Sequence, residues 1–277
     1  METDMIPNDT IDKLAMCFAS LSELGQQLSE EQWKLPTECP GWTVQDNLSH
    51  IVAFERVLNG YPATTHQAKG FDYIKNPIGT SNENEIDARR HLSGAEVLAE
   101  WNETAAARLA TLRSADEAYY STEMATPTGL GTIADLLHIR VLDCWVHEQD
   151  MRRALGITGH LSGPAAEHTI DRLIRTIPIV VGKRASTPDG QSVVIDITAD
   201  PVLGGVRRHI ICTVVNGRAA LVDIEPEAPL CRLTMDTQTF LKLATGRRGA
   251  EQITNSIEYA GDLIHGHKVV ASMNMMI

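Results

Sequence analysis

The chain has 277 residues, 43% of them hydrophobic and 22% charged, which excludes a disordered chain and allows two domains of ordinary size. Acidic residues outnumber basic ones by 36 to 24, and the formal net charge of -12 argues against binding to nucleic acid or to an anionic membrane surface. The 5 cysteines include no CxxC pair, so we expect free thiols in a reducing compartment. The N-terminus lacks the pattern of a secretory signal and apolar runs are short, so the sequence predicts a soluble, cytoplasmic protein.

The first part of the chain has the periodicity of helices. Apolar residues recur at steps of three and four over residues 8–28, which predicts an amphipathic helix. Thr43 followed by Asp46 has the capping-box pattern and predicts the start of a second helix. We expect a long polar loop over residues 63–83 and a third helix over residues 84–114.

Two more helices are predicted after a polar loop over residues 115–131. Thr132 with Asp135 repeats the capping pattern and predicts the start of a fourth helix. A fifth helix is predicted over residues 164–183, where Pro178 is expected to kink or shorten it.

The second part of the chain reads as short strands with helices after them. Residues 185–191 are the best candidate for a linker. Asn216-Gly217 between two strand-like runs predicts a hairpin. Strands are expected over residues 193–197, 207–215, 219–224 and 230–235, a helix over 237–244, and further helix in the tail from about 249. The sequence therefore predicts an α+β protein of two domains, residues 1–185 and 186–277.

The predicted fourth helix carries polar side chains on a face that is otherwise apolar. At about 100° per residue, Asp143, His147 and Asp150 fall on one side of it. A buried carboxylate is costly unless it is paired or bound to a metal. Asp143 and His147 are four residues apart, which suits two metal ligands but equally suits an ion pair or a hydrogen-bonded pair.

His50, in the predicted second helix, lies on or beside an apolar surface. Two interpretations stay open for it: a hydrogen-bonded core histidine, or a third ligand that joins the Asp143–His147 pair inside a bundle. Three protein ligands with an open fourth position are typical of catalytic zinc, although other divalent metals also accept two histidines and a carboxylate.

These stretches resemble a known family. CPGWTVQDNLSHIVAFE (39–55) and VLDCWVHEQDMRRALG (141–156) are similar to the two signatures of the mycothiol-dependent maleylpyruvate isomerase family. LATGRR (243–248) resembles, more weakly, part of that family's second domain. The resemblance implies a DinB-like metal-binding four-helix bundle followed by a sterol-carrier-like α/β domain.

The resemblance also implies a site. It assigns a divalent metal, usually zinc, to His50, Asp143 and His147, and mycothiol as the thiol cosubstrate. Asp143 departs from the family, which often has glutamate there, and this shorter side chain changes the expected geometry. Asp150 matches an acidic position that either orients His147 or contacts the thiol.

Arg247, next to Arg248, is a candidate catalytic residue from the second domain. It either reaches the bundle site to hold an anionic group or belongs to an exposed arginine pair after a helix. Thiol and substrate are expected to meet between the two domains, with residues 63–83 and 115–131 lining or covering the pocket.

Several functions are compatible with this set of residues. We favour a mycothiol S-transferase, or thiol exchange, acting on a small-molecule electrophile, in specialised metabolism for example. The alternatives are a mycothiol-dependent cis–trans isomerase of the maleylpyruvate type, a metal-assisted hydrolase, and a non-enzymatic ligand-binding module. The expected partners are thus a small-molecule thiol and a small-molecule electrophile, without nucleic acid or membrane, and both a monomer and a homodimer stay open.

Overall fold

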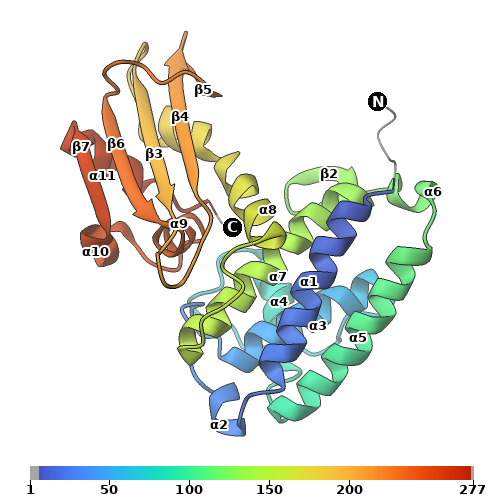
Figure 1. Ribbon diagram of the computed structural model, residues 1–277. Coiled ribbons are helices and arrows are strands. Elements are labelled where there is room, and N and C mark those ends of the chain that lie inside the picture. The colour runs from blue at the N-terminus through green and yellow to red at the C-terminus, as the bar shows by residue number, and fades with distance from the viewer. Residues whose placement is uncertain (1–5, 276–277) are drawn as a thin grey trace. The chain divides into compact units, whose positions relative to one another are not determined.

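The computed structural model describes residues 6–275, and the chain divides into two compact units, Met1–Thr158 and Gly159–Ile277 (Figure 1). Residues 159–185, which were predicted to belong to the first domain, group with the second unit. A π-helix over Ile179–Arg184 packs against a strand and a helix of that unit, which explains the grouping.

Within the described residues, the first unit is built on four long helices that form a bundle. Helix α1 packs against α5 and α7, and α3 packs against the same two helices. The long helices are α1 (Asn8–Gly25), α3 (Val44–Leu58), α5 (Gly94–Ser114) and α7 (Ile133–Leu155). The shorter elements are α2 (Glu30–Trp33), α4 (Pro77–Asp87), α6 (Glu117–Tyr120), β1 (Glu123–Thr126) and β2 (Gly129–Thr132).

Helices α3 and α7 begin where their capping boxes predicted. The Thr43 hydroxyl accepts from the Asp46 backbone N–H at 3.2 Å, and the Asp46 carboxylate accepts from the Thr43 N–H at 2.9 Å. Thr132 and Asp135 repeat the exchange at 3.1 and 2.9 Å. Both ends satisfy backbone donors that would otherwise lack partners, which sets the rotational phase of the two helices.

The predicted third helix over 84–114 is wrong, because Ser93 interrupts it. Ser93 has extended backbone and exchanges hydrogen bonds with Glu96, which starts α5 afresh. A side chain at Gly94 would place its Cβ 2.0 Å from Trp33 Cδ1, so this position requires glycine. The expected loop 63–83 also ends earlier, because α4 starts at Pro77. The expected loop 115–131 instead contains α6 and the hairpin of β1 and β2.

The second unit is a five-stranded sheet, within the described residues, with helices. The strand order is β5-β4-β3-β6-β7; β3 and β6 are parallel, and the other neighbours are antiparallel. The strands are β3 (Ser192–Thr198), β4 (Arg208–Val215), β5 (Arg218–Val222), β6 (Cys231–Asp236) and β7 (Ile257–Gly261). The helices are α8 (Pro164–Ile174), α9 (Thr237–Ala244), α10 (Ala250–Ile253) and α11 (Leu263–Ala271), besides the π-helix and a 3-10 turn over Thr254–Ser256.

Local signals for this unit are mostly confirmed. Asn216 and Gly217 both have positive φ, 53° and 72°, as a tight hairpin turn requires. Pro178 separates α8 from the π-helix, as expected. The tail was predicted to be helical, but β7 forms the edge of the sheet there, pairing with β6. Among the described helices, none has the length and hydropathy that crossing a bilayer demands.

Candidate metal centre

The three predicted ligands lie together between α3 and α7. His50 comes from α3, and Asp143 and His147 come from successive turns of α7. His50 Nε2 lies 3.2 Å from Asp143 Oδ2, and His147 Nε2 lies 3.6 Å from Asp143 Oδ1. One nitrogen or oxygen from each residue falls within 4.8 Å of the other two. Both histidines are buried, at 5% and 6% exposure.

This donor set fits a divalent metal ion. Zinc–nitrogen and zinc–oxygen bonds are about 2.0–2.2 Å long, so two ligand atoms at tetrahedral angles lie roughly 3.3–3.6 Å apart. The distances from the two histidine nitrogens to the Asp143 carboxylate, 3.2 Å to Oδ2 and 3.6 Å to Oδ1, are close to that range. Two imidazoles and one carboxylate are also a ligand combination of catalytic zinc sites.

Asn47 orients His147. Its side-chain nitrogen donates to Thr37 Oγ1 at 3.1 Å and to the Thr43 carbonyl at 2.8 Å, which leaves Oδ1 as the acceptor for His147 Nδ1 at 2.7 Å. A neutral His147 therefore carries its proton on Nδ1 and directs the lone pair of Nε2 towards Asp143. Sequence reasoning missed Asn47, although it stands three residues before His50 on the same helix.

Asp150 lies on the far side of His147. Its Oδ2 is 3.4 Å from His147 Nδ1 and accepts from the Cys39 thiol at 3.4 Å, while its Oδ1 accepts from Arg153. Cys39, His147 and Asp150 also meet the spacing of a metal group. Because Nδ1 carries a proton when it donates to Asn47, this group is better suited to supporting His147 than to holding a second ion. Contact of Asp150 with a thiol stays a prediction.

A buried chain of charges reaches Asp143. Arg140 donates to Asp143 Oδ2 at 2.7 Å and to Glu55 at 2.7 Å, and Glu55 also accepts from Arg108 at 3.2 Å. Burial alone would raise the pKa of Asp143, but Arg140, His50 and His147 outweigh it and hold that pKa well below its usual value.

The protonation states suit ligation. Burial lowers the pKa of His50, and the opposing attraction of Asp143 does not offset it. At neutral pH the centre therefore offers a neutral imidazole at His50 and an ionised carboxylate at Asp143, the forms that bind metal.

Trp42 covers the two histidines. Its ring centroid lies 5.3 Å from that of His50 and 5.6 Å from that of His147. The indole N–H donates to Glu83 at 3.1 Å, and Glu83 also accepts from the Tyr73 hydroxyl at 2.9 Å. The indole is thereby held in place over one side of the two histidines.

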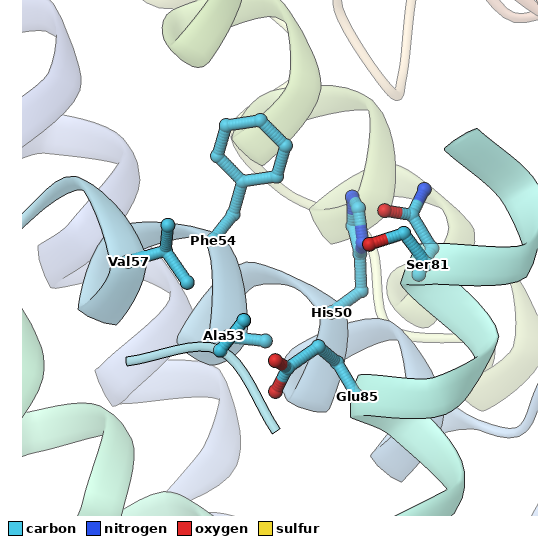
Figure 2. Close-up of a pocket in the computed structure, with 8 residues that line it drawn as sticks. His50, Ala53, Phe54, Val57, Ser81 and Glu85 are labelled. Atoms are coloured by element: carbon cyan, nitrogen blue, oxygen red, sulfur yellow. The ribbon is translucent and has the colours of Figure 1, made fainter. Parts of the chain in front are cut away.

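A pocket of about 140 Å³ opens beside His50 (Figure 2). It lies between α3, α4 and the segment that connects them. Part of the lining comes from residues 63–83, which were expected to line a pocket; residues 115–131 do not contribute to the described lining. The lining residues are His50, Ala53, Phe54, Val57, Ala63, Ser81, Asn82 and Glu85.

Arg247, the candidate from the second unit, follows α9. Its guanidinium donates to the Thr245 carbonyl at 3.0 Å, and its backbone N–H donates to the Lys242 carbonyl at 2.8 Å. Both contacts lie within its own unit, and a role of Arg247 at the bundle site stays a prediction.

Comparison with known proteins identifies the family of the first unit. The sequence model of the mycothiol maleylpyruvate isomerase N-terminal domain matches residues 14–152, which contain the whole donor set. An uncharacterised protein of Mycobacterium tuberculosis is 26% identical over 142 residues, 50% of this chain and 52% of that protein. The chain thus spans about half the length of the curated relatives it matches.

The fold class is confirmed by solved structures. A crystal structure of the mycothiol-dependent maleylpyruvate isomerase matches with a TM-score of 0.58, covering 91% of this chain and 92% of that chain at 14% identity. At this identity the likeness establishes the fold and no more. Sterol carrier protein 2 from Yarrowia lipolytica matches 39% of this chain at a TM-score of 0.26, which is too weak to support a conclusion.

Proposed function

The chain belongs to the family of the mycothiol maleylpyruvate isomerase N-terminal domain, and from this we propose that it is an enzyme that activates mycothiol at His50, Asp143 and His147. The observation that carries the proposal is the convergence of these three donors, with His147 oriented by Asn47. The electrophile that reacts with the thiol is a small molecule. We favour S-transfer as the reaction.

The residues of the centre have separate parts in this proposal. A divalent metal ion, most naturally zinc for this donor set, would lower the pKa of a thiol bound beside it. His50 and His147 supply nitrogen donors, and Asp143 supplies the anionic donor that Arg140 keeps ionised. Trp42 limits access of water, which strengthens electrostatic interactions at the site.

The proposed reaction starts with loss of the thiol proton to solvent, since the thiolate is the nucleophile. Its sulfur forms a bond to the electrophilic carbon. In S-transfer, the bond from that carbon to a leaving group breaks and its electron pair departs with the leaving group. With a conjugated double bond, the π bond breaks instead and the adjacent carbon takes a proton from solvent. The second candidate is isomerisation, which the matched crystal structure's name favours. There the displaced π electrons move to a conjugated carbonyl oxygen, the carbon–carbon bond rotates, and reversal expels the thiolate.

Mycothiol must be kept reduced to act as a nucleophile, so we propose that the enzyme works in the cytoplasm. The cysteines agree with a reducing compartment, because all five are buried and none forms a disulfide: Cys17, Cys39, Cys144, Cys212 and Cys231.

Metal content and product analysis test the proposal. Purified protein should contain about one divalent ion per chain by elemental mass spectrometry, and His147→Ala should lose it. His138→Ala, on the same helix but outside the donor set, is the matched control and should retain it. A chain that neither contains nor takes up metal would contradict the proposal and favour a ligand-binding module.

Incubation with mycothiol and a panel of electrophiles that includes maleylpyruvate then identifies the reaction. A stable thiol adduct observed by mass indicates S-transfer, whereas a rearranged product with free thiol indicates isomerisation. Product that forms equally without thiol would indicate metal-assisted hydrolysis and refute the thiol chemistry.

A further inference from the structure

The pocket of Figure 2 adjoins the proposed nucleophile through His50, whose imidazole both joins the donor set and lines the pocket. A molecule held in the pocket therefore lies next to the centre. One wall is the apolar face of α3, formed by Ala53, Phe54 and Val57, which follow His50 by three, four and seven residues.

This apolar wall is rigidly supported. The Arg140 guanidinium carbon lies 4.2 Å from the centroid of the Phe54 ring, on which it stacks. Arg140 is itself fixed by Glu55 and Asp143. Val57 leaves 45% of its surface exposed at the same wall, an apolar area available to a ligand.

The opposite wall on α4 offers hydrogen-bonding groups. Ser81 and Asn82 line the pocket, and within residues 6–275 their side chains have no protein partner. Glu85 is different, because its carboxylate accepts from the Thr64 backbone N–H at 2.6 Å and from Arg89 at 3.0 Å. Glu85 thus closes the pocket by holding the connecting segment, while Ser81 and Asn82 stay available to a ligand.

The charge of the lining selects against anions. Glu85 is its one carboxylate, and the described lining includes no lysine or arginine. The arginines around the pocket already bind carboxylates: Arg89 binds Glu85 and Glu100, and Arg56 binds Glu100. Arg140, which stacks on Phe54, binds Glu55 and Asp143. A dicarboxylate such as maleylpyruvate would bring two negative charges beside Glu85. The metal ion proposed at His50 would offset only the carboxylate next to it, and desolvating the other, unpaired carboxylate is costly.

On the basis of the thiol chemistry proposed above, we infer that this pocket binds an uncharged α,β-unsaturated carbonyl compound with a ring-sized apolar group. The apolar group packs on Phe54 and Val57, and a carbonyl or hydroxyl oxygen bonds to Ser81 or Asn82. A dry cavity of about 150 Å³ in another protein accommodates benzene, so a volume of about 140 Å³ suits a single ring.

Binding without thiol tests the inference. The probes are benzylideneacetone, an uncharged unsaturated ketone with one ring, and maleate, a dicarboxylate, titrated calorimetrically into the full chain. The native protein should bind benzylideneacetone at least about tenfold more tightly than maleate. The double variant Ser81→Ala, Asn82→Ala should bind benzylideneacetone roughly threefold to tenfold more weakly, because it loses a hydrogen bond to the ligand. Equal affinity of the native protein for both probes would overturn the inference.

Val57→Arg supplies the missing cation, and Val57→Met is its matched control of similar length and helix propensity. Val57→Arg should shift the ratio of the two affinities towards maleate by about tenfold, whereas Val57→Met should keep the preference for the uncharged probe. An unchanged ratio in Val57→Arg contradicts the inference.

Thiol-dependent adduct formation with benzylideneacetone separates this inference from the proposed function. Binding that follows the variant pattern, with neither an adduct nor cis–trans isomerisation in the presence of mycothiol, supports the pocket and refutes the thiol chemistry. Adduct that forms at equal rates in all the variants supports the thiol chemistry and refutes this pocket as the substrate site.

Discussion

Replacement of Asn47 by leucine should weaken metal binding about tenfold. The change keeps the side-chain volume similar but removes the acceptor 2.7 Å from His147 Nδ1, leaving a buried N–H without that partner. Loss of a group that orients a ligand histidine typically costs about 10–100-fold in affinity, or roughly 1.4–2.7 kcal/mol. Asp150 Oδ2, 3.4 Å from the same nitrogen, offers a replacement acceptor, so we expect the lower end of the range.

Calorimetric titration of zinc into chelator-treated protein measures the effect. Asn47→Asp keeps an acceptor for His147 and should stay within about threefold of the native affinity. Thr37→Val is the control, because it removes a partner of the Asn47 side-chain nitrogen but leaves Oδ1 untouched. A native zinc affinity in Asn47→Leu, with unchanged circular dichroism, would refute the assignment of Asn47 as the residue that orients His147.

Other predictions concern stability. Glu55→Gln leaves two buried arginines without their shared anion, and should lower the free energy of unfolding in urea by about 3–5 kcal/mol; a loss below about 1 kcal/mol would contradict this. For Asp196, burial raises the pKa, but His209 and Arg232 outweigh it and lower the pKa overall. Its contribution, about 1 kcal/mol or less, should be present above the unfolded pKa of about 3.9 and vanish as pH falls through the lower folded pKa. The native protein should therefore be more stable than Asp196→Asn at pH 7 and equally stable at low pH. A difference in free energy of unfolding that persists at low pH would contradict a stabilising role for the ionised Asp196 carboxylate. Chelation should lower the melting temperature of the native protein but not of His147→Ala, with about 2.7 kcal/mol lost if free metal had been at 100 times Kd; equal shifts in both proteins would contradict His147 as a ligand.

Helical periodicity and capping signals were enough to predict that Asp143 and His147 share one face of a helix. The boxes at Thr43 and Thr132 are local in sequence, and they set where α3 and α7 begin. Once the start of α7 is fixed, the four-residue spacing places Asp143 and His147 on the same face of that helix. The assignment of His50 needed the family resemblance as well, because a histidine on an apolar helix surface is compatible with several roles.

Features that depend on contacts between elements could not be predicted in this way. Asn47 and Asp150 both lie near His147 Nδ1, at 2.7 and 3.4 Å, and their ranking depends on the separation of α3 from α7. The break before α5 has a local signal in Ser93 and Glu96, but apolar periodicity on both sides concealed it. The contact of Gly94 with Trp33, which fixes that break in space, joins residues far apart in the chain.

The aspartate at position 143 has a consequence for the whole bundle. Its carboxylate accepts from Arg140 one turn earlier, which links the donor set to Glu55 and Arg108. Arg108, Glu55, Arg140 and Asp143 together carry no net charge. These four charged groups therefore compensate one another without a metal ion. These four groups therefore do not need a metal to offset repulsion between them. Structural zinc sites differ, because the domain that supplies their ligands does not fold without the metal. A metal at this centre must compete with Arg140 for Asp143 Oδ2, and that competition favours an exchangeable, functional ion over a structural one.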